Sequence, residues 1–256
     1  MIFYFIVFVL GLVIGSFLNC VIYRLEQEKS FLKGRSYCTH CKHELAWQDL
    51  IPIFSFVFLR GKCRYCQKPI SFQYPLVEIA TGILFVLIYY SFPNILVSCF
   101  LSLVSCLLVI IFVYDLKHFI IPDNIIYLAV AIAFLFNILN SYFVTHNSYF
   151  IANSLGAAFS AALFFLLIVL VSKGQWMGIG DIKLAFFMGL FLGFPNVLLA
   201  LFSAFFLGAI IGIGLVISRK RTLKSEIPFG PFLVTGTFLA LFWGSRIINW
   251  YLNLFL

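Results

Sequence analysis

Three aspartates stand where long apolar stretches begin or end, and their position suggests a chemical use. The chain has four aspartates: Asp49 lies in a polar segment, whereas Asp115, Asp123 and Asp181 lie at the edges of apolar ones. Each alone could be a helix cap or a solvated boundary residue, because a carboxylate costs far less at the end of a membrane span than at the bilayer centre. All three on one side of a membrane predict a shared site. There one carboxylate would activate water while a protonated partner polarises a carbonyl group.

The residues around Asp181 sharpen this hypothesis. Gly178 and Gly180 precede it, and we expect them to interrupt a helix and to let a substrate backbone approach the carboxylate closely. We expect Asp181 to precede the first turn of a helix, Asp115 to end another, and Asp123 to start a third. The chain shows no Ser–His–Asp pattern and no glycine-rich phosphate loop after a strand.

A second set of reactive side chains consists of four cysteines in two CxxC motifs separated by 21 residues. Two such pairs supply the four thiolates of a tetrahedral structural zinc, and we predict that the ligands are Cys38, Cys41, Cys63 and Cys66. The alternatives are two redox pairs or four free thiols, but a cytoplasmic location argues against stable disulfides. His40 and His43 could replace a ligand, although four cysteines make solvated histidines the simpler interpretation.

The elements that position these residues are membrane spans. The chain has 256 residues, of which 63% are hydrophobic and only 10% charged, whereas soluble domains carry about 25% charged residues. We therefore predict an all-α polytopic membrane protein with about eight transmembrane helices. The expected spans are 1–23, 76–92, 95–114, 125–143, 153–172, 184–195, 197–217 and 229–250. The sixth is short for a full crossing.

The distribution of lysine and arginine predicts the topology. Sixteen of the 17 basic residues fall in the loops after the first, third, fifth and seventh spans, and only Arg246 lies near the other side. Basic loops stay in the cytoplasm, so we expect these four loops inside and both termini outside. The net charge of +8 is then a topological signal and requires no nucleic-acid partner. The first span lacks a basic amino-terminal region and is interpreted as retained rather than as a signal peptide.

We expect three parts: a first transmembrane helix at 1–23, a small cytoplasmic zinc-ribbon-like loop domain at 24–75, and a multi-span membrane domain at 76–256. The loop is too small to fold on its apolar residues alone, which is a further reason to expect a metal.

Several motifs together resemble one family. They are "GSFLNCVIYRL" (15–25), the paired CxxC motifs running into "CRYCQKPISFQYPLVE" (63–78), "DLKHFIIPD" (115–123), "GIGDIKL" (178–184) and "PFGPFL" (228–233). Each is weak alone, but in this order they resemble, almost end to end, the type IV prepilin peptidases, which are membrane aspartyl proteases of the GxGD type. Cys20 stands where the family often has a β-branched residue.

The resemblance implies that Asp115 and Asp181 form the catalytic pair, with Asp123, Gly178, Gly180 and Lys183 in supporting roles. Within that pair, the helix dipoles at the two positions would favour Asp181 as the base and Asp115 as the acid. Asp123 would end the loop and cap the fourth span, although it could instead be the catalytic partner. The implied substrates are type IV prepilin or pseudopilin precursors, cut after a glycine that follows a short basic leader. The implied location is the bacterial cytoplasmic (inner) membrane, with the active site facing the cytoplasm. Many relatives also methylate the new amino terminus with S-adenosylmethionine, for which no donor pocket is visible in the sequence. The oligomeric state is open.

Two other classes of protein fit parts of the pattern. A proton-coupled transporter also uses boundary carboxylates, but it usually shows internal repeats and acids near the midplane, and neither is found. A zinc-dependent membrane sensor would make the cysteines functional and the aspartates incidental. Mutation discriminates between the classes, because a peptidase should tolerate chelation far better than the loss of Asp181.

Overall fold

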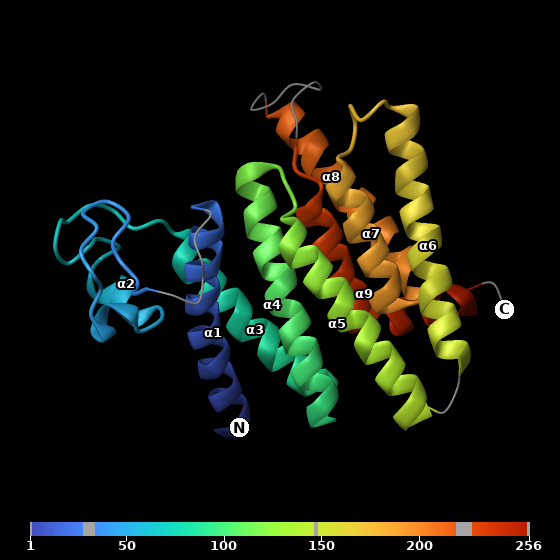
Figure 1. Cartoon of the computed structure of the whole chain (residues 1–256), viewed down its shortest axis with the longest axis horizontal. Coiled ribbons are helices and arrows are strands. Elements are labelled where there is room, and N and C mark those ends of the chain that lie inside the picture. The colour runs from blue at the N-terminus through green and yellow to red at the C-terminus, as the bar shows by residue number, and fades with distance from the viewer. Residues whose placement is uncertain (1, 28–33, 146–147, 219–226, 255–256) are drawn as a thin grey trace. The chain divides into compact units, whose positions relative to one another are not determined.

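The protein is built from helices, most of them long and apolar. The structure, a computed structural model, describes residues 2–27, 34–145, 148–218 and 227–254, and these contain no β-strand beyond two isolated bridges (Figure 1). In chain order the elements are α1 (Ile2–Glu26), the 3₁₀ turn Trp47–Leu50, α2 (Phe54–Phe58), α3 (Gln73–Ser91), α4 (Ile95–His118), α5 (Asp123–Leu139), the π-helical turn Asn140–Thr145, α6 (Ser148–Val171), α7 (Ile179–Leu192), α8 (Asn196–Ile217) and α9 (Gly230–Asn253).

The all-α polytopic membrane fold is confirmed. Seven helices of the described chain are long and apolar enough to cross a membrane: α1, α3, α4, α5, α6, α8 and α9. The remaining expected span, the sixth (184–195), corresponds to α7, which has 14 residues and is the short one foreseen from the sequence. In hydrocarbon a helix satisfies its backbone hydrogen bonds internally, which is why apolar segments of this length adopt this form.

The chain divides into two compact units, Met1–Ile110 and Ile111–Leu256, and α4 contributes residues to both. The first unit holds the cysteine motifs, and the second holds Asp115, Asp123 and Asp181. The three-part division into 1–23, 24–75 and 76–256 follows membrane topology and stays a prediction.

In the first unit, α1 and α3 pack against each other in antiparallel directions through small residues. A Cβ atom on Gly11 would lie 2.7 Å from the Cα of Gly82, and one on Gly15 would lie 2.7 Å from the Cα of Glu78. Small residues allow close backbone approach, and van der Waals packing is what holds helices together in lipid. The side chain of Asn19 adds a hydrogen bond to the Tyr74 carbonyl at 3.0 Å.

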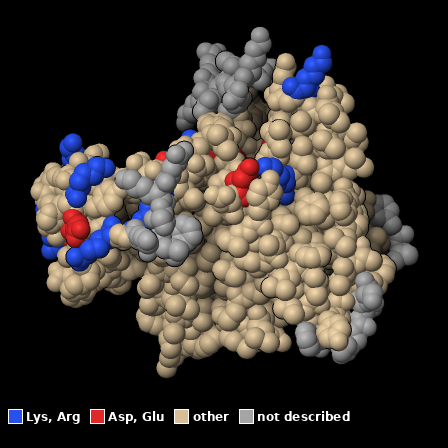
Figure 2. All heavy atoms as spheres, in the orientation of Figure 1, with Lys and Arg blue, Asp and Glu red and all other residues tan. Residues whose placement is uncertain are grey.

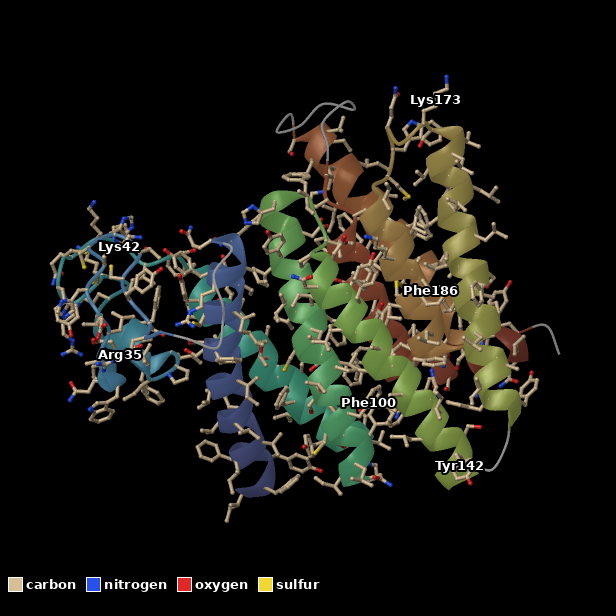
Figure 3. All side chains as sticks on the ribbon, viewed as in Figure 1. Arg35, Lys42, Phe100, Tyr142, Lys173 and Phe186 are labelled. Carbon is tan, nitrogen blue, oxygen red and sulfur yellow. The ribbon has the colours of Figure 1, made fainter. Side chains whose placement is uncertain are left out.

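In the second unit the helices alternate in direction, as Figure 1 shows. The C-terminal ends of α4, α6 and α8 therefore lie at the same end of the bundle as the N-terminal ends of α5, α7 and α9. Lys173, just after α6, marks this end in Figure 3, and Tyr142, just after α5, marks the opposite one. All three aspartates of interest are placed at the end marked by Lys173, which we call the polar end.

Charged side chains are scarce elsewhere on this unit. In Figure 2 the described surface below the polar end is uncharged on the visible face, as expected for helices that face lipid. Six of the basic residues used to predict topology lie outside the described residues: Lys29, Lys33, Arg219, Lys220, Arg221 and Lys224.

α7 sits in tight contact with its neighbours. A Cβ on Gly189 would lie 2.4 Å from both the Ala157 oxygen and the Ala158 Cα of α6. On another side, the buried Asn137 side chain of α5 donates a 2.8 Å hydrogen bond to the Leu190 carbonyl. These contacts hold the short helix, and therefore Asp181 at its start, in one position.

Candidate active site and candidate metal centre

Asp181 lies in the first turn of α7, at the polar end of the second unit. Its Oδ2 accepts a 3.1 Å hydrogen bond from the backbone N–H of Gly178, the residue before the helix. A carboxylate three residues into a helix that reaches back to the N-cap is a standard helix start. The expectation that Asp181 precedes the helix was therefore wrong by one turn, because this local hydrogen bond begins the helix at Ile179.

Asp115 lies in the last turn of α4, and its carboxylate reaches the start of another helix. Its Oδ2 accepts a 3.0 Å buried hydrogen bond from the backbone N–H of Gly230, the first residue of α9. A Cβ on residue 230 would lie only 2.5 Å from that oxygen. Glycine at this position is therefore what lets the carboxylate reach the backbone N–H.

The carboxylates of Asp115 and Asp181 are both buried from solvent and interact with each other. Asp115 is 4% exposed and Asp181 is 9% exposed, and the two groups lie within range of direct electrostatic repulsion. Two interacting carboxylates that cannot easily ionise together hold one proton between them and titrate as a unit. This arrangement can supply a base and an acid at the same time.

The helix-dipole argument for dividing the roles does not hold as formulated. It assumed that Asp115 meets only the C-terminal end of α4, but its carboxylate also meets the N-terminus of α9 through Gly230. Both carboxylates therefore accept a hydrogen bond from a helix N-terminus, which stabilises negative charge. The dipoles no longer distinguish the base from the acid.

Asp123 has a different environment. Its Oδ1 accepts a 2.6 Å ion-paired hydrogen bond from the Nζ of Lys183, and its side chain is 59% exposed. The same ammonium group lies 5.0 Å from the ring centroid of Tyr127. Asp123 begins α5, as expected, but no side-chain capping bond is made there, so its expected capping role is replaced by a bridge from α5 to α7.

The two glycines before Asp181 have different surroundings. Gly180 lies inside α7, so it does not interrupt that helix, and a Cβ there would meet the Ile121 side chain, with its nearest atom at 3.1 Å. Its small size serves packing against the loop between α4 and α5, and the close approach of a substrate stays a prediction. Gly178 has an ordinary extended conformation, and a Cβ there would come no closer than 3.9 Å to any other group.

Gly230 and Ile121 were missed by reasoning from the sequence. The motif "PFGPFL" was noticed but given no role, because nothing in it indicates contact with a residue 115 positions away. Ile121 gave no signal beyond its place in an apolar loop.

The four cysteines of the first unit come together as predicted. Their Sγ atoms all lie within 4.8 Å of one another, and those of Cys38 and Cys66 are 3.9 Å apart. A tetrahedral zinc with four sulfur ligands requires S···S separations of about 3.8 Å. Four cysteines at this spacing fit zinc, and they are the metal-binding group found among the described residues.

The two CxxC loops have the same backbone geometry. In the first, Cys38 N–H donates to the His43 carbonyl and Lys42 N–H donates to the Cys38 carbonyl; in the second, Cys63 N–H donates to Lys68 and Gln67 N–H to Cys63. Lys42 and Gln67 share a positive φ of 59° and 58°. Two matching knuckles that face each other are the geometry of a zinc-ribbon-like site.

Other side chains brace this cluster. Asp49 accepts hydrogen bonds from Arg64 Nε at 2.8 Å and from Tyr65 Oη at 3.2 Å, both inside the second knuckle. The His43 ring stacks on Tyr65 with centroids 3.7 Å apart, so it has a packing contact. Burial raises the pKa of the Cys38 thiol, but the backbone N–H groups of Cys41 and His40 and the Cys63 and Cys41 thiols together lower it to about 7. The backbone N–H of His43 lowers the pKa of Cys41, but desolvation and the Cys38 and Cys66 thiols raise it to about 11, so negative charge is favoured first at Cys38.

Comparison with known proteins shows that two parts of the chain match family models. Residues 9–92 match the model of the bacterial peptidase A24 N-terminal domain, and residues 101–213 match that of the type IV leader peptidase family. A comparison with solved structures found no match.

Among curated proteins, the chain is similar to proteins named prepilin leader peptidase/N-methyltransferase. The one from Aeromonas hydrophila is 34% identical over 98% of this chain and 94% of its own length. The one from Bacillus subtilis is 33% identical over 97% of this chain and 98% of its own length. The one from Legionella pneumophila is 32% identical over 98% of this chain and 94% of its own length.

Proposed function

Because the chain belongs to the type IV leader peptidase family, we propose that it is a membrane-embedded aspartyl endopeptidase that removes the leader from type IV prepilin or pseudopilin precursors. The observation that carries the proposal is the buried pair of Asp115 and Asp181, each held by one backbone N–H at a helix N-terminus. Asp123 is assigned a supporting role, since it is ion-paired and exposed.

The proposed chemistry uses the pair as base and acid. The ionised carboxylate takes a proton from a water molecule while the water oxygen attacks the carbonyl carbon of the scissile peptide bond. The protonated carboxyl group of the partner donates its proton to the carbonyl oxygen. The tetrahedral intermediate then collapses, the C–N bond breaks, and the amide nitrogen leaves with a proton from the pair. The products are a leader ending in a carboxylate and a pilin with a new amino terminus.

The substrate dictates where this must happen. A short basic leader before an apolar helix stays on the cytoplasmic side, where basic residues are retained. We therefore assign the polar end of the second unit to the cytoplasmic face, which agrees with the charge pattern of the loops. Cleavage after glycine suits a buried site, because an extended glycine needs the least room.

The cysteine cluster is assigned a structural zinc. Cys38, Cys41, Cys63 and Cys66 would hold the ion, which supplies the cross-link that a loop of this size otherwise lacks. No step of the peptidase reaction is routed through it.

Methylation of the new amino terminus is a second proposal, supported by the names of the relatives, which include N-methyltransferase. The donor would be S-adenosylmethionine, to which we assign no residue. The transporter and sensor alternatives find no support among the relatives named above, which carry the name of a peptidase.

One experiment tests both activities. The purified protein in lipid nanodiscs is incubated with a prepilin, with and without S-adenosylmethionine, and both products are weighed by mass spectrometry. We expect a leader and a pilin whose masses sum to the precursor plus one water, and an added methyl group only with the donor. An uncut precursor in the presence of folded protein would refute the peptidase assignment, and cleavage without mass gain would remove methylation alone.

A further inference from the structure

The loop domain carries a short helix whose apolar side chains are turned outward. In α2 the side chains of Phe54, Val57 and Phe58 are 61%, 66% and 82% exposed. We call these three residues the α2 face. Contiguous aromatic and aliphatic exposure of this kind marks a surface that meets something other than water.

The position of α2 along the membrane spans indicates what it meets. The backbone N–H of Ile53, just before α2, donates a 2.8 Å hydrogen bond to Oε2 of Glu78 in α3. Glu78 in turn packs directly on Gly15 of α1. Gly15 lies on α1 nine residues before Arg24, so the start of α2 is tied to the side of the α1–α3 pair rather than beyond its end. Figure 1 agrees, with α2 level with the body of α1 rather than beyond its C-terminal end.

The acceptor in this contact is withdrawn from water, since Glu78 is only 6% exposed. Ile53 has a φ of 60°, a conformation that a β-branched residue adopts only when its surroundings hold it there. The loop domain is thus fastened with α2 folded back beside the two spans.

Basic residues follow α2 immediately. Arg60 and Lys62 are exposed, and they line a cavity of about 330 Å³ together with the apolar side chains of Phe56, Ile70 and Phe72. An apolar surface with cations at its edge complements the interface of an anionic bilayer, where acyl chains lie beneath negative headgroups.

We propose that the α2 face docks into the headgroup region of the cytoplasmic leaflet, as an interfacial anchor for the loop domain, with Arg60 and Lys62 at anionic phospholipid headgroups. The anchor and the Glu78 contact together hold the zinc-binding domain against the membrane surface. The proposal concerns the first unit alone and does not depend on the peptidase assignment.

A protein partner is the competing occupant. The precursor proposed above approaches with a basic leader, which Arg60 and Lys62 would repel, whereas they attract anionic lipid. The loop domain is joined at both ends to membrane spans, α1 and α3, so the bilayer is always next to it.

Tryptophan fluorescence in nanodiscs tests the docking. All four native tryptophans (Trp47, Trp176, Trp243 and Trp250) are changed to Phe in the full chain, and one reporter is introduced by Phe58→Trp or, separately, by Phe54→Trp. The matched control is Thr39→Trp, an exposed position in the first CxxC loop. Each protein is placed in anionic nanodiscs, with or without lipids brominated near the headgroup, and then treated with aqueous acrylamide.

We expect the α2 reporters to emit at shorter wavelength than the reporter at position 39, to be quenched by brominated lipid, and to be shielded from acrylamide. The reporter at position 39 should be quenched by acrylamide and little affected by brominated lipid. Two α2 reporters guard against a single badly folded variant, and elution as a single monodisperse species confirms folding of each. If both reporters behave like position 39, the proposal is wrong. It also fails if they are quenched by acrylamide in lipid and become shielded only when a prepilin is added, since the face would then be a substrate surface.

Discussion

A carboxylate that must take up and release a proton is best kept away from bulk water and from a permanent ion pair. Asp115 and Asp181 meet both conditions, because each is buried and accepts one backbone hydrogen bond. Asp123 meets neither, since it is more than half exposed and its charge is matched by Lys183. The structure therefore separates three aspartates that look alike in the sequence.

We predict that Asp115→Asn and Asp181→Asn each lower the rate of leader cleavage by about 100- to 10,000-fold, the contribution of a positioned acid or base. An amide keeps the shape of the side chain but cannot exchange a proton, so binding of the precursor should survive. Single-turnover cleavage and precursor binding, measured with each folded variant, check this.

Asp123→Asn is the matched control and should retain measurable activity, because an exposed ion pair contributes only about 1 kcal/mol or less. Substantial turnover by Asp181→Asn would contradict the proposed chemistry. An inactive Asp123→Asn beside an active Asp115→Asn would transfer the catalytic role to Asp123.

Gly230→Ala tests the backbone contact of Asp115. The new methyl group would overlap Oδ2 of Asp115, so the carboxylate must move away from the N–H of residue 230. A displacement of about 1 Å at a group that takes part in the reaction can lower the rate by about 100-fold. We expect kcat to fall more than KM rises, as measured by steady-state cleavage of a prepilin.

Gly178→Ala is the comparison, because residue 178 also donates to a carboxylate of the proposed catalytic pair but has room for a Cβ. It should keep most of the activity. Equal losses in the two variants would show that the contact of Gly230 has no special role.

At this scale the sequence predicted which residue types matter but not what each touches. The GxGD motif located Asp181, but it did not indicate that Gly180 packs against Ile121. Local hydrogen bonding in the first turn of α7 extends the helix through Gly180, and contacts such as that of Gly230 depend on a tertiary structure that spacing does not encode.

Among the elements, α7 depends on its neighbours most. At 14 residues it spans about 21 Å, less than the hydrocarbon thickness of about 30 Å, so packing rather than length must fix its depth. Its contact with α6 leaves no room for any side chain at Gly189. That helix contact sets the height of Asp181 at the polar end.

We therefore predict that Gly189→Ala destabilises the protein by about 1–3 kcal/mol or more, because the obstructing atoms belong to the α6 backbone and cannot rotate aside. Gly156 is on α6 itself, and a Cβ there would meet nothing within 4 Å, so Gly156→Ala should be neutral or stabilising by up to about 1 kcal/mol. Thermal unfolding midpoints in nanodiscs compare the two. A Gly189→Ala protein as stable as the parent would show that the α6–α7 contact is looser than described.

The loop domain gives a second prediction at this scale. Replacing Cys63 by Ser should release the metal and loosen residues 34–72, because binding and folding are coupled in small zinc sites. Elemental analysis should find about one zinc per chain in the parent and a loss in the variant. The matched control is Cys106→Ser, outside the cluster. A metal-free parent with full activity would rule out a required structural zinc.

For the molecule as a whole, composition and charge predicted most of the architecture. Apolar length alone located all the long helices to within a few residues, since a membrane allows few other solutions. What it could not give is the packing, which depends on single glycines such as Gly189, or the matched geometry of the two knuckles, which CxxC spacing only suggests.

The last prediction is the orientation of the second unit, which rests on the alternation of its helices and on the excess of basic loops. Short epitope tags inserted after residue 120 and after residue 175 should react with antibody only in permeabilised cells, because both loops lie at the polar end with Asp115 and Asp181. Tags after residue 194 and at the C-terminus should react in intact spheroplasts, since α7 and α9 end on the other side. A cytoplasmic site is required for a leader that never crosses the membrane. Reaction of the tags after 120 and 175 from opposite sides would separate the two carboxylates and break the single active site; reaction of both from outside would place the pair beyond the reach of the leader.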